Sequence, residues 1–467
     1  MARAKKEAAL TPEERFQAAL VPDWEWPYKL PENWCWVRLY SLAHIISKGT
    51  TPKGGKDAYV EKGIRFLRIE NINEDGSISH ENIKHITEEM HTGFLRRSIL
   101  CKDDILISIA GTLGKTGIVG EADLPLNTNQ AISFVRLIRG NLLPQYIKMS
   151  IDNPKTQDML ISQTKVTSIP NLTLEIIGNC AIPLAPLAEQ QRIVDRIESL
   201  FSKLDEAKEK AQAVVDSFET RRAAILHKAF TGELTAKWRE EHGAGMESWE
   251  YKTFEAIVEN MQNGLAKRKG ISGTPYVVLR LANLTDCGFN TDDLREILLD
   301  EKEQANYELR PNDVIMIRVN GSKDNVGKQY LITNQHHWAF CDHIIRIQYS
   351  NRLLPQYMIY FSRSKNYRIY VKENIVSSAG QNTISRKGMV GLVVPIPCLN
   401  EQFEIVHILD DLFSKEQQSK EAAEAALDQI NLMKKSILAR AFRGELGTND
   451  PSEESAVELL KRGLEKK

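Results

Sequence analysis

The chain has 467 residues, of which 42% are hydrophobic and 26% are charged, and its net charge at pH 7 is −1. This length is too great for one compact core, so we expect two or more domains of ordinary soluble composition. The balanced charge provides no overall attraction for nucleic acid, so a DNA-binding face must gather basic residues locally. The sequence has no apolar run of 18 residues and no signal-peptide core at its N-terminus, which predicts a cytoplasmic protein without membrane contact.

Residues 1–30 form an extension with one helix start. Thr11-Pro12-Glu13-Glu14 offers a capping threonine, proline at the first helical position and glutamate three residues after the cap. This is the pattern of a capping box, so we expect a short helix there.

From Trp34 to about Ala181, short apolar runs alternate with turn residues. The clearest runs are GIRFLRIENI, DILISIAG, TGIVG and AISFVRLI, and their length and flanking glycines are typical of strands. Leu143-Pro144 begins a helix, because proline is favoured at the first helical position. The segment therefore predicts a mixed α/β domain.

The segment from Pro183 to Leu234 is expected to form one long helix, because it opens with prolines and then lacks Pro and Gly until Gly232. Its apolar residues follow spacings of four and three, with Arg221 as a polar break: Ile193, Ile197, Leu200, Leu204, Ala207, Ala211, Val214, Phe218 and Ile225. A sustained 3.5-residue period predicts a coiled-coil seam. About 45 helical residues span roughly 65 Å.

This segment returns 212 positions later as Pro395 to Leu446, with 22 of 52 positions identical and no gap. The second copy keeps the frame, with breaks at Glu416 and Ser419: Ile405, Leu409, Leu412, Ala423, Ala426, Ile430, Met433 and Ile437. Each helix has an apolar edge to bury, and the other copy is its natural partner.

The domain between the two copies follows the order of the first. PYVVLRLANL, DVIMIRVNGS and HIIRIQY stand where GIRFLRIENI, DILISIAGT and AISFVRLI stood, and Leu354-Pro355 repeats Leu143-Pro144. An amphipathic helix is expected near Val457 to Leu464. The repeat predicts an α+β fold in which two mixed α/β domains alternate with two antiparallel coiled-coil helices, giving a pseudo-twofold tandem array.

Catalytic motifs are missing from the sequence. Gly111-Thr112-Leu113-Gly114-Lys115-Thr116 has two residues between its glycines, where a phosphate-binding P-loop needs four, and no helix is expected after it. We find no methyltransferase, hydrolase or HExxH signature. The six cysteines form no CxxC pair, and the cluster His336, His337, Cys341 and His343 is a weak zinc candidate. We therefore expect no cofactor or metal in this chain.

Polar loop residues at corresponding places in the two domains suit DNA readout, which uses Arg or Lys against guanine and Asn or Gln against adenine. In the first domain they are Arg68, Asn71, Ser108, Thr112, Lys115, Asn129, Gln130, Thr164, Lys165 and Thr167. In the second they are Arg280, Asn283, Arg318, Asn320, Ser322, Lys323, His343, Ser378, Gln381 and Asn382. Lys115 in its glycine-rich turn suits a position near the DNA backbone.

Over almost its whole length the chain resembles the specificity subunit of Type I restriction-modification systems. The likeness is carried by PLAPLAEQ at 183–190, AFTGELT at 229–235 with Trp238-Arg239, the second copies at 395–402 and 441–446, and Leu30-Pro31-Glu32-Asn33-Trp34. Cys398 and Asn400 depart from the usual pattern. The resemblance implies two target-recognition domains that each read half of a bipartite DNA site.

The resemblance also implies that the chain is not an enzyme. Two modification subunits that methylate adenine with S-adenosylmethionine, and restriction subunits that use ATP and magnesium, are the implied partners besides double-stranded DNA. The matching helix ends are expected to bind partners symmetrically, through Leu187, Glu189, Gln190, Phe230, Glu233, Leu399, Glu401, Gln402, Phe442 and Glu445.

The expected boundaries are an extension at 1–30, recognition domains at 31–185 and 236–397, spacer helices at 186–235 and 398–446, and a tail helix at 447–467. Two other functions stay open from the residues. One is a coiled-coil scaffold that joins two protein-binding domains; the other is a fused methyltransferase or nuclease with an unfamiliar site. Neither the target sequence nor the domain that reads each half follows from the sequence.

Overall fold

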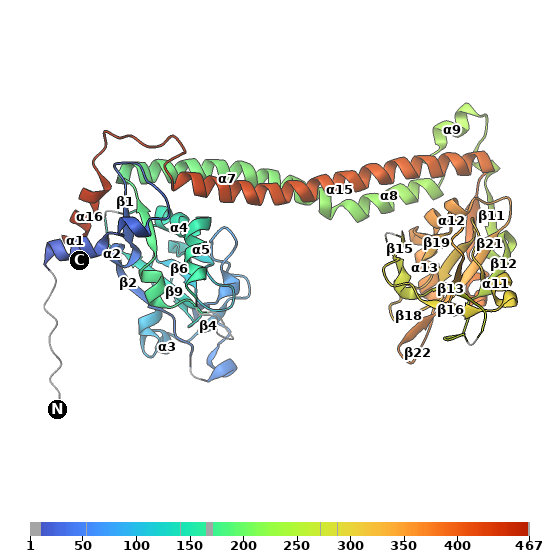
Figure 1. Ribbon diagram of the computed structural model, residues 1–467, viewed down its shortest axis with the longest axis horizontal. Coiled ribbons are helices and arrows are strands. Elements are labelled where there is room, and N and C mark those ends of the chain that lie inside the picture. The colour runs from blue at the N-terminus through green and yellow to red at the C-terminus, as the bar shows by residue number, and fades with distance from the viewer. Residues whose placement is uncertain are drawn as a thin grey trace. The chain divides into compact units, whose positions relative to one another are not determined.

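The computed structural model describes residues 11–52, 54–140, 142–164, 171–270, 272–286 and 288–465. The chain divides into two compact units: the first unit joins Met1–Lys210 to Ala426–Lys467, and the second unit is Ala211–Ala425. Each unit contains a mixed α/β domain and parts of the long helices (Figure 1). Among the described residues, no helix has both the length and the apolarity that crossing a membrane requires.

The first unit has two four-stranded sheets. One is antiparallel with the order β2-β9-β6-β7; the other has the order β4-β3-β8-β5, with β3 and β8 parallel. The strands are β1 (Cys35–Arg38), β2 (Ala43–Lys48), β3 (Ile64–Leu67), β4 (Lys84–Ile86), β5 (Ile99–Leu100), β6 (Ile105–Ser108), β7 (Thr116–Ile118), β8 (Leu126–Thr128), β9 (Ile132–Leu137) and β10 (Ala181–Leu184). The helices are α1 (Pro12–Ala19), α2 (Leu39–Leu42), α3 (Glu88–Thr92), α4 (Pro144–Asp152), α5 (Pro154–Ser162), α6 (Leu174–Gly178) and α16 (Ala456–Glu465).

The second unit repeats this plan with the sheets β12-β21-β17-β19 and β16-β13-β20, in which β13 and β20 are parallel. Its strands are β11 (Glu250–Thr253), β12 (Val258–Asn263), β13 (Thr274–Leu279), β14 (Leu284–Thr285), β15 (Gly288–Phe289), β16 (Glu296–Leu299), β17 (Val314–Ile317), β18 (Val319–Asn320), β19 (Gln329–Leu331), β20 (Trp338–Phe340), β21 (Ile344–Tyr349), β22 (Val376–Ser378), β23 (Gln381–Thr383) and β24 (Val393–Ile396). Its helices include α9 (Ala236–Glu241), α10 (Phe254–Ile257), α11 (Glu301–Tyr307), α12 (Pro355–Ser362), α13 (Lys365–Glu373) and α14 (Arg386–Met389).

The strands and short helices expected from the sequence are present. All four residues of β6 and of β17 are buried, which explains why both read as continuous apolar runs without alternation. Pro144 and Pro355 each occupy the first turn of a helix. Thr11 and Glu14 form the expected capping box of α1.

The long helices are α7 (Leu187–Asp216), α8 (Phe218–Phe230) and α15 (Leu399–Ala441). The second copy is one helix of 43 residues, as expected, but the first is interrupted at Ser217. The Ser217 hydroxyl donates to the carbonyl of Ala213 at 2.5 Å and accepts a hydrogen bond from Arg221. Serine bonding back to a carbonyl four residues earlier perturbs helices, a local effect that the apolar period does not reveal.

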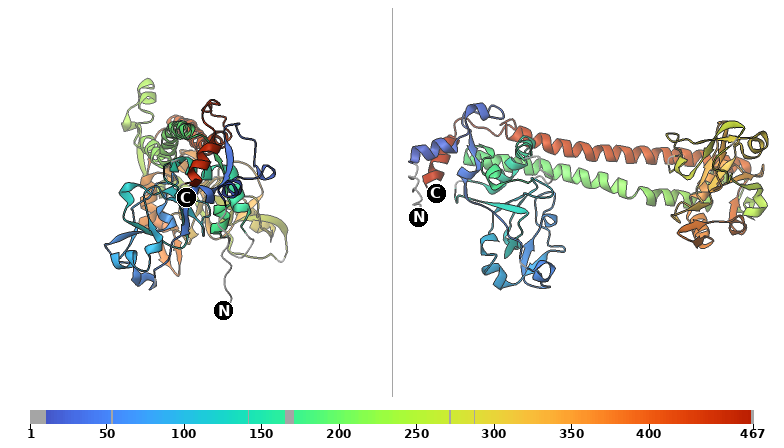
Figure 2. Two further views of the ribbon diagram at one scale, coloured as in Figure 1. Left: turned by 90° about the vertical axis from the view of Figure 1, so that its left-hand side faces the viewer. Right: turned by 60° about the horizontal axis from the view of Figure 1, so that its bottom comes forward.

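The helices pair antiparallel within each unit (Figure 2). In the first unit Lys434 contacts Asp205 in an ion pair and Phe201 through its ring at 4.9 Å, while Arg192 binds the later residues Thr448 and Glu453. In the second unit Arg221 pairs with Glu416 at 2.7 Å, and Arg222 lies 4.8 Å from the ring of Phe413. Lys420 lies 4.8 Å from the ring of Phe218. In both units, later residues of one helix meet earlier residues of the other.

The seam differs from the expected stripe around its middle. Ala207, Ala426 and Met433 are exposed, whereas Leu427 and Lys434 are partly buried. Arg221 and Glu416, which interrupt the apolar stripes, face each other as an ion pair. Ala423 and Ile430 are buried, as the stripe predicts, but Leu427 and Lys434 take the places expected for Ala426 and Met433. Beyond Ser419 every second seam position is therefore shifted by one residue, and polar residues take part in the seam.

Each domain is fixed to its long helix by an antiparallel strand pair and a buried tyrosine. β1 pairs with β10, which leads into α7, and β11 pairs with β24, which leads into α15. The Tyr146 hydroxyl donates to the Pro183 carbonyl at 2.6 Å, and the Tyr357 hydroxyl donates to the Pro395 carbonyl at 2.7 Å. These matching bonds join α4 to β10 in the first unit and α12 to β24 in the second.

Candidate nucleic-acid interface

In the first unit, four strand connections meet at one edge of the two sheets. β2, β3, β6 and β8 all end there, and backbone hydrogen bonds tie the following loops together. The Thr50 amide donates to Thr128 at 3.1 Å, the Asn129 amide to Leu67 at 3.4 Å, and the Ile109 amide to Ala131 at 2.8 Å. We call residues 49–52, 68–71, 109–115 and 129–131 the first loop edge.

Most of the residues predicted to read DNA in the first domain belong to this edge. Thr112 and Gln130 are exposed, and Arg68, Lys115 and Asn129 are partly buried. Arg68 forms an ion pair with Glu70 at 2.8 Å, whereas Lys115 has no ion pair within the described residues. The edge therefore offers amide, hydroxyl and ammonium groups within one set of adjoining loops.

The other predicted residues of this domain have different positions. Thr164 follows α5, and its amide and hydroxyl both bind the carbonyl of Ile161. Lys165 and Thr167 lie outside the described residues. After them the chain returns to the first loop edge, because the Leu172 amide donates to Ile109 at 3.0 Å.

Asn71 and Ser108 are corrections, because both are buried and shape the loops instead of facing a ligand. The Asn71 side chain accepts the Arg68 amide at 3.1 Å. The Ser108 hydroxyl binds the Thr112 carbonyl and accepts the Lys115 amide at 2.8 Å. Short polar side chains satisfy nearby backbone groups as readily as they read bases, and sequence chemistry alone does not separate the two roles.

The second unit builds an equivalent edge where β12, β13, β17 and β20 end. The Cys341 amide donates to Leu279 at 3.1 Å, the Leu265 amide to Phe340 at 2.8 Å, and the Arg318 amide to His343 at 2.8 Å. We call residues 264–270, 280–283, 318–327 and 341–343 the second loop edge. It gains the hairpin β22–β23, which pairs with β18.

The hairpin turn has an unusual backbone. Ala379 and Gly380 have φ angles of 46° and 77°, the positive values that a two-residue hairpin turn requires at both positions. The turn presents Ser378 and Gln381, both exposed, at its base. The described part of the first unit contains no such hairpin, and residues 165–170 lie outside it.

Predicted readers in the second domain divide in the same way. Ser322 and Lys323 are exposed, and Arg280, Arg318, Asn320 and His343 are partly buried. Arg280 pairs with Asp293 at 2.8 Å, and Arg318 donates to the Asp342 carbonyl at 3.2 Å. The Asn320 side chain accepts the Ser322 amide at 2.9 Å.

Asn283 and Asn382 are corrections of the same kind as Asn71. Asn283 is 1% exposed; it accepts the Arg280 amide at 2.9 Å and donates to the carbonyls of Asn290 and Asp293. Asn382 is 8% exposed and donates to the Gly321 carbonyl at 2.8 Å. Both hold a loop of the second edge in place.

Of the four zinc candidates, Cys341 and His343 lie close together, and Asp342, which was not among them, joins them: the ligand atoms of these three residues lie within 4.8 Å of one another. Arg268 already pairs with Asp342 at 2.8 Å, and His337 binds Glu308. We assign no metal to this cluster.

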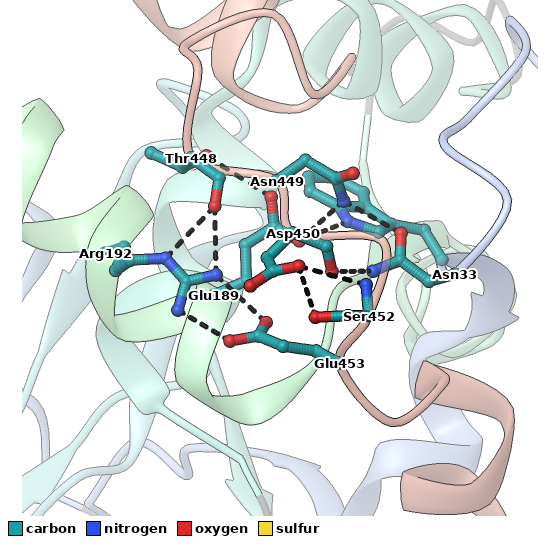
Figure 3. A network of polar contacts seen from close by, with 9 residues as sticks. Asn33, Glu189, Arg192, Thr448, Asn449, Asp450, Ser452 and Glu453 are labelled. Carbon is teal, nitrogen blue, oxygen red and sulfur yellow. Dashed lines mark hydrogen bonds and ion pairs between the residues drawn. The ribbon is translucent and has the colours of Figure 1, made fainter.

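Of the predicted partner-binding residues at the helix starts, Glu189 and Glu401 are instead buried. Each is the centre of a set of hydrogen bonds within the chain, which we call a latch. Glu401 accepts hydrogen bonds from Trp249 at 3.0 Å, Thr235 at 2.6 Å and Arg239. Glu189 accepts from Trp34 at 2.7 Å, Asn449 at 2.9 Å and Thr448 at 3.3 Å (Figure 3). In both latches, the entry tryptophan of a domain is tied to the start of a long helix.

The glutamines that follow serve the same purpose. Gln190 accepts the Leu143 amide at 3.1 Å and donates to the Ala185 carbonyl at 2.9 Å; Gln402 accepts the Leu354 amide at 2.8 Å and donates to the Pro397 carbonyl at 2.9 Å. These two glutamines and the preceding glutamates, Glu189 and Glu401, are all 0% exposed. Their predicted direct contact with a partner is therefore corrected, since their polar groups are used inside the chain.

Phe230 and Phe442 are likewise core residues that pack on Tyr357 and Tyr146, with ring centroids 5.3 Å apart in both pairs. Leu187 and Leu399 are 44% and 41% exposed, and Glu233 and Glu445 are also exposed. The sequence did not single out Phe403, which is 58% exposed near the start of α15. An apolar side chain one turn from Leu399 is the signal that could have indicated it.

Comparison with known proteins matches the chain in two separate segments. A family model described as "Type I restriction modification DNA specificity domain" matches residues 31–215 and 248–427. The chain belongs to this family. Each matched segment contains one mixed domain and the start of the long helix that follows it, so the specificity domain occurs twice and the fold class expected from the repeat is confirmed.

Relatives match over most of their length. The Type I restriction enzyme StySPI specificity subunit of Salmonella potsdam is 29% identical, and that of EcoKI from Escherichia coli strain K12 is 26% identical; each alignment covers 90% of both chains. The HsdS subunit from Thermoanaerobacter tengcongensis has a similar fold, with a TM-score of 0.58 at 19% identity over 90% of this chain and all of that one. We conclude that this protein is a specificity subunit of a Type I restriction-modification system.

Proposed function

We propose that this specificity subunit recognises a bipartite, asymmetric duplex DNA site, with each loop edge reading one half. The observation that carries the proposal is that the same edge is built twice from different side chains. Strand ends and backbone bonds correspond between the edges, while side chains at corresponding places differ: Asn129 and Gln130 follow β8, whereas Cys341 and Asp342 follow β20. Equivalent scaffolds with unlike readers suit two unlike half-sites.

The exposed groups fit the two tasks of a DNA-binding surface. Amide and hydroxyl groups such as those of Gln130, Ser378 and Gln381 can bond base edges in the major groove. Lys115 and Lys323, which have no ion pair within the described residues, suit phosphate contacts that position the protein. The target adenine must leave the base stack to reach a partner's active site, so these edges would hold a distorted duplex.

The paired helices are proposed to fix the distance between the half-sites. α15 has 43 residues and therefore spans about 65 Å at 1.5 Å per residue. DNA repeats its groove about every 34 Å, so readers on one face sample sites set by whole turns. Antiparallel ion pairs in both units, Asp205 with Lys434 and Arg221 with Glu416, support a stiff spacer.

Two modification subunits are proposed to dock on the matching helix starts, around the exposed Leu187 in one copy and Leu399 in the other. They would methylate adenine with S-adenosylmethionine, and restriction subunits would use ATP and magnesium. This chain would supply specificity without catalysis and act in the cytoplasm.

Exchange of residues 34–181 for those of another family member tests the proposal. Methylated-motif sequencing of a host that expresses the hybrid should show one changed half-site, one retained half-site and an unchanged gap. A hybrid that changes both halves or neither would contradict separate reading.

Binding and methylation assays with the purified protein distinguish the proposed function from the other two. A scaffold would show no preference for any bipartite sequence over random DNA when assembled with the modification subunit. A fused enzyme would transfer label from S-adenosylmethionine to DNA without partners.

A further inference from the structure

A cleft of about 360 Å³ in the second unit carries more positive than negative charge. It lies between α8, the end of α12, the β14–β15 hairpin and the start of β19. Its cationic side chains are Arg222, Lys328, Arg363 and Arg368, and its acidic ones are Asp286 and Glu219. Sequence reasoning did not single out any of these six residues as a reader.

Two of the four cationic side chains, those of Arg222 and Arg363, form neither an ion pair nor a hydrogen bond within the described residues. Lys328 binds Asp286 at 2.5 Å, and Arg368 donates to the carbonyls of Val326 and Asp324 at 2.9 and 2.8 Å. Arg222 instead stacks over the rings of Phe413 and Phe218, at 4.8 and 5.3 Å. Arg363 lies 5.8 Å from the ring of Tyr360. Neither guanidinium has a carboxylate within ion-pair distance among the described residues.

Arg222 and Arg363 also repel each other. The pKa of Arg363 is lowered, first by the partial removal of water from its guanidinium and second by the positive charge of Arg222. An anion placed between the two would remove that repulsion and accept hydrogen bonds from two forked donors, the arrangement in which arginine binds phosphate best.

The charge is not a by-product of the repeated fold, because the first unit neutralises the equivalent positions. Asp152 stands eight residues after Pro144, as Arg363 stands eight after Pro355, and it binds Lys148 at 3.0 Å. Lys434, 212 residues after Arg222, is paired with Asp205. The unpaired arginines therefore belong to the second unit.

The cleft adjoins the second loop edge. Lys328 directly follows residues 321–327, and its carbonyl accepts the amide of Ile317, where β17 ends. Arg368 holds the carbonyls of Asp324 and Val326 in the same loop that exposes Ser322 and Lys323. A ligand on the loop edge can thus extend into the cleft, which favours DNA over a separate protein partner.

We propose that the cleft holds a phosphate group of the DNA backbone between Arg222 and Arg363. This inference rests on the proposed function, because it takes the second loop edge to lie on duplex DNA. The contact is independent of base sequence: it positions the second domain on its half-site and adds salt-dependent affinity.

Arg363→Gln tests the contact, since its side chain is exposed and its loss should not disturb folding. The full chain, assembled with its modification subunits, is titrated with a random duplex and with a duplex carrying its methylated motif, from 50 to 200 mM salt. Losing one phosphate contact lowers the slope of log affinity against log salt by about 0.9, so the wild type should lose about threefold more affinity than the variant across this range. The change should be equal for both duplexes.

Two matched variants complete the test. Arg363→Lys keeps the charge and should keep the slope, and Lys434→Gln alters the equivalent of Arg222 in the first unit and should keep it too. An unchanged slope for Arg363→Gln overturns the proposal, and weaker capture of the modification subunit alongside it would assign the cleft to an acidic protein surface. Failure of the proposed function is seen separately, as a wild type that does not prefer the motif over the random duplex.

Discussion

Replacing Glu401 by alanine should lower the free energy of unfolding of the second unit, and the contacts of Glu401 in its latch give the size of the loss. The carboxylate is 0% exposed, and the side chain of its partner Arg239 is 7% exposed. Removing one member of a buried ion pair leaves the other charge uncompensated, which costs about 3–5 kcal/mol. Trp249 and Thr235 would also lose their acceptor.

Hydrogen exchange measured by mass spectrometry reports the loss separately for each segment of the chain. Such a local measurement is needed because a chain with two compact units is not expected to unfold in a single two-state step. With 1.4 kcal/mol for each tenfold change, exchange around residues 235–253 and the first turns of α15 should accelerate about a hundredfold or more. Peptides of the first unit should keep their rates. The proposed coupling between Glu401 and Arg239 further requires that adding Arg239→Ala to Glu401→Ala costs much less than Arg239→Ala alone.

Asp411→Ala is the matched control. Asp411 lies in the same helix and pairs with Lys415 at 2.7 Å, but both side chains are more than half exposed, so its loss should cost less than 1 kcal/mol. If Glu401→Ala and Asp411→Ala had equal effects, or if the two latch variants were additive, the latch would not be the element that holds this domain on its helix.

Three further predictions concern other parts of the chain. Cys101 and Cys398 are exposed and should react with a thiol reagent at neutral pH, whereas burial raises the pKa of Cys180 to about 12 and should protect it until the first unit unfolds; mass spectrometry of the labelled protein tells them apart. Burial raises the pKa of Glu189 above its usual value, so between the two pKa values the folded state binds a proton that the unfolded state has released. The contribution of Glu189 to the free energy of unfolding is therefore fully present below about pH 4.5 and is lost as pH rises through the raised pKa. Local exchange at Trp34 should show this pH dependence in the wild type and lose it in Glu189→Gln; identical pH profiles would refute it. Lys115→Ala should weaken binding to all duplexes alike and reduce the slope of log affinity against log salt by about 0.9, the value for one phosphate contact. A loss of affinity confined to one sequence would show that Lys115 reads a base instead.

The sequence determined the repeat and its elements well because these depend on local, periodic signals. The fully apolar β6 and β17, the capping box at Thr11 and the prolines that start α4 and α12 each appear where the residues predict them. The break at Ser217 and the exchange of Ala426 and Met433 for Leu427 and Lys434 in the seam were missed, because they depend on a hydroxyl bond and on a cross-helix ion pair of Lys434. Such contacts leave no period in the sequence.

The structure brings most of the predicted DNA-reading residues together at the two loop edges, but it does not expose all of their side chains. Parallel and antiparallel strand ends bring the loops of each edge together, so the region follows from the order of the strands. Whether a polar side chain is available to a ligand depends on the backbone groups near it. Hydrogen bonds to the backbone occupy the side chains of Asn71, Ser108, Asn283 and Asn382, whereas those of Lys115, Gln130 and Lys323 make no such bond within the described residues. Likewise, the repeated Glu-Gln pairs, Glu189-Gln190 and Glu401-Gln402, stabilise the fold, because all four side chains are buried and form hydrogen bonds inside the chain.

The gap between half-sites in the methylated DNA motif tests the central claim most directly. Seven residues of helix are inserted into both spacers, after Lys208 and after Ile430, close to the ion pair between Asp205 and Lys434. The insertion lengthens each spacer by about 10 Å, which is the rise of about three base pairs. Sequencing of methylated adenines in the host should then show the same two half-sites with a gap longer by about three base pairs. Modification of the original motif with its original gap would contradict the claim that the helices set the spacing.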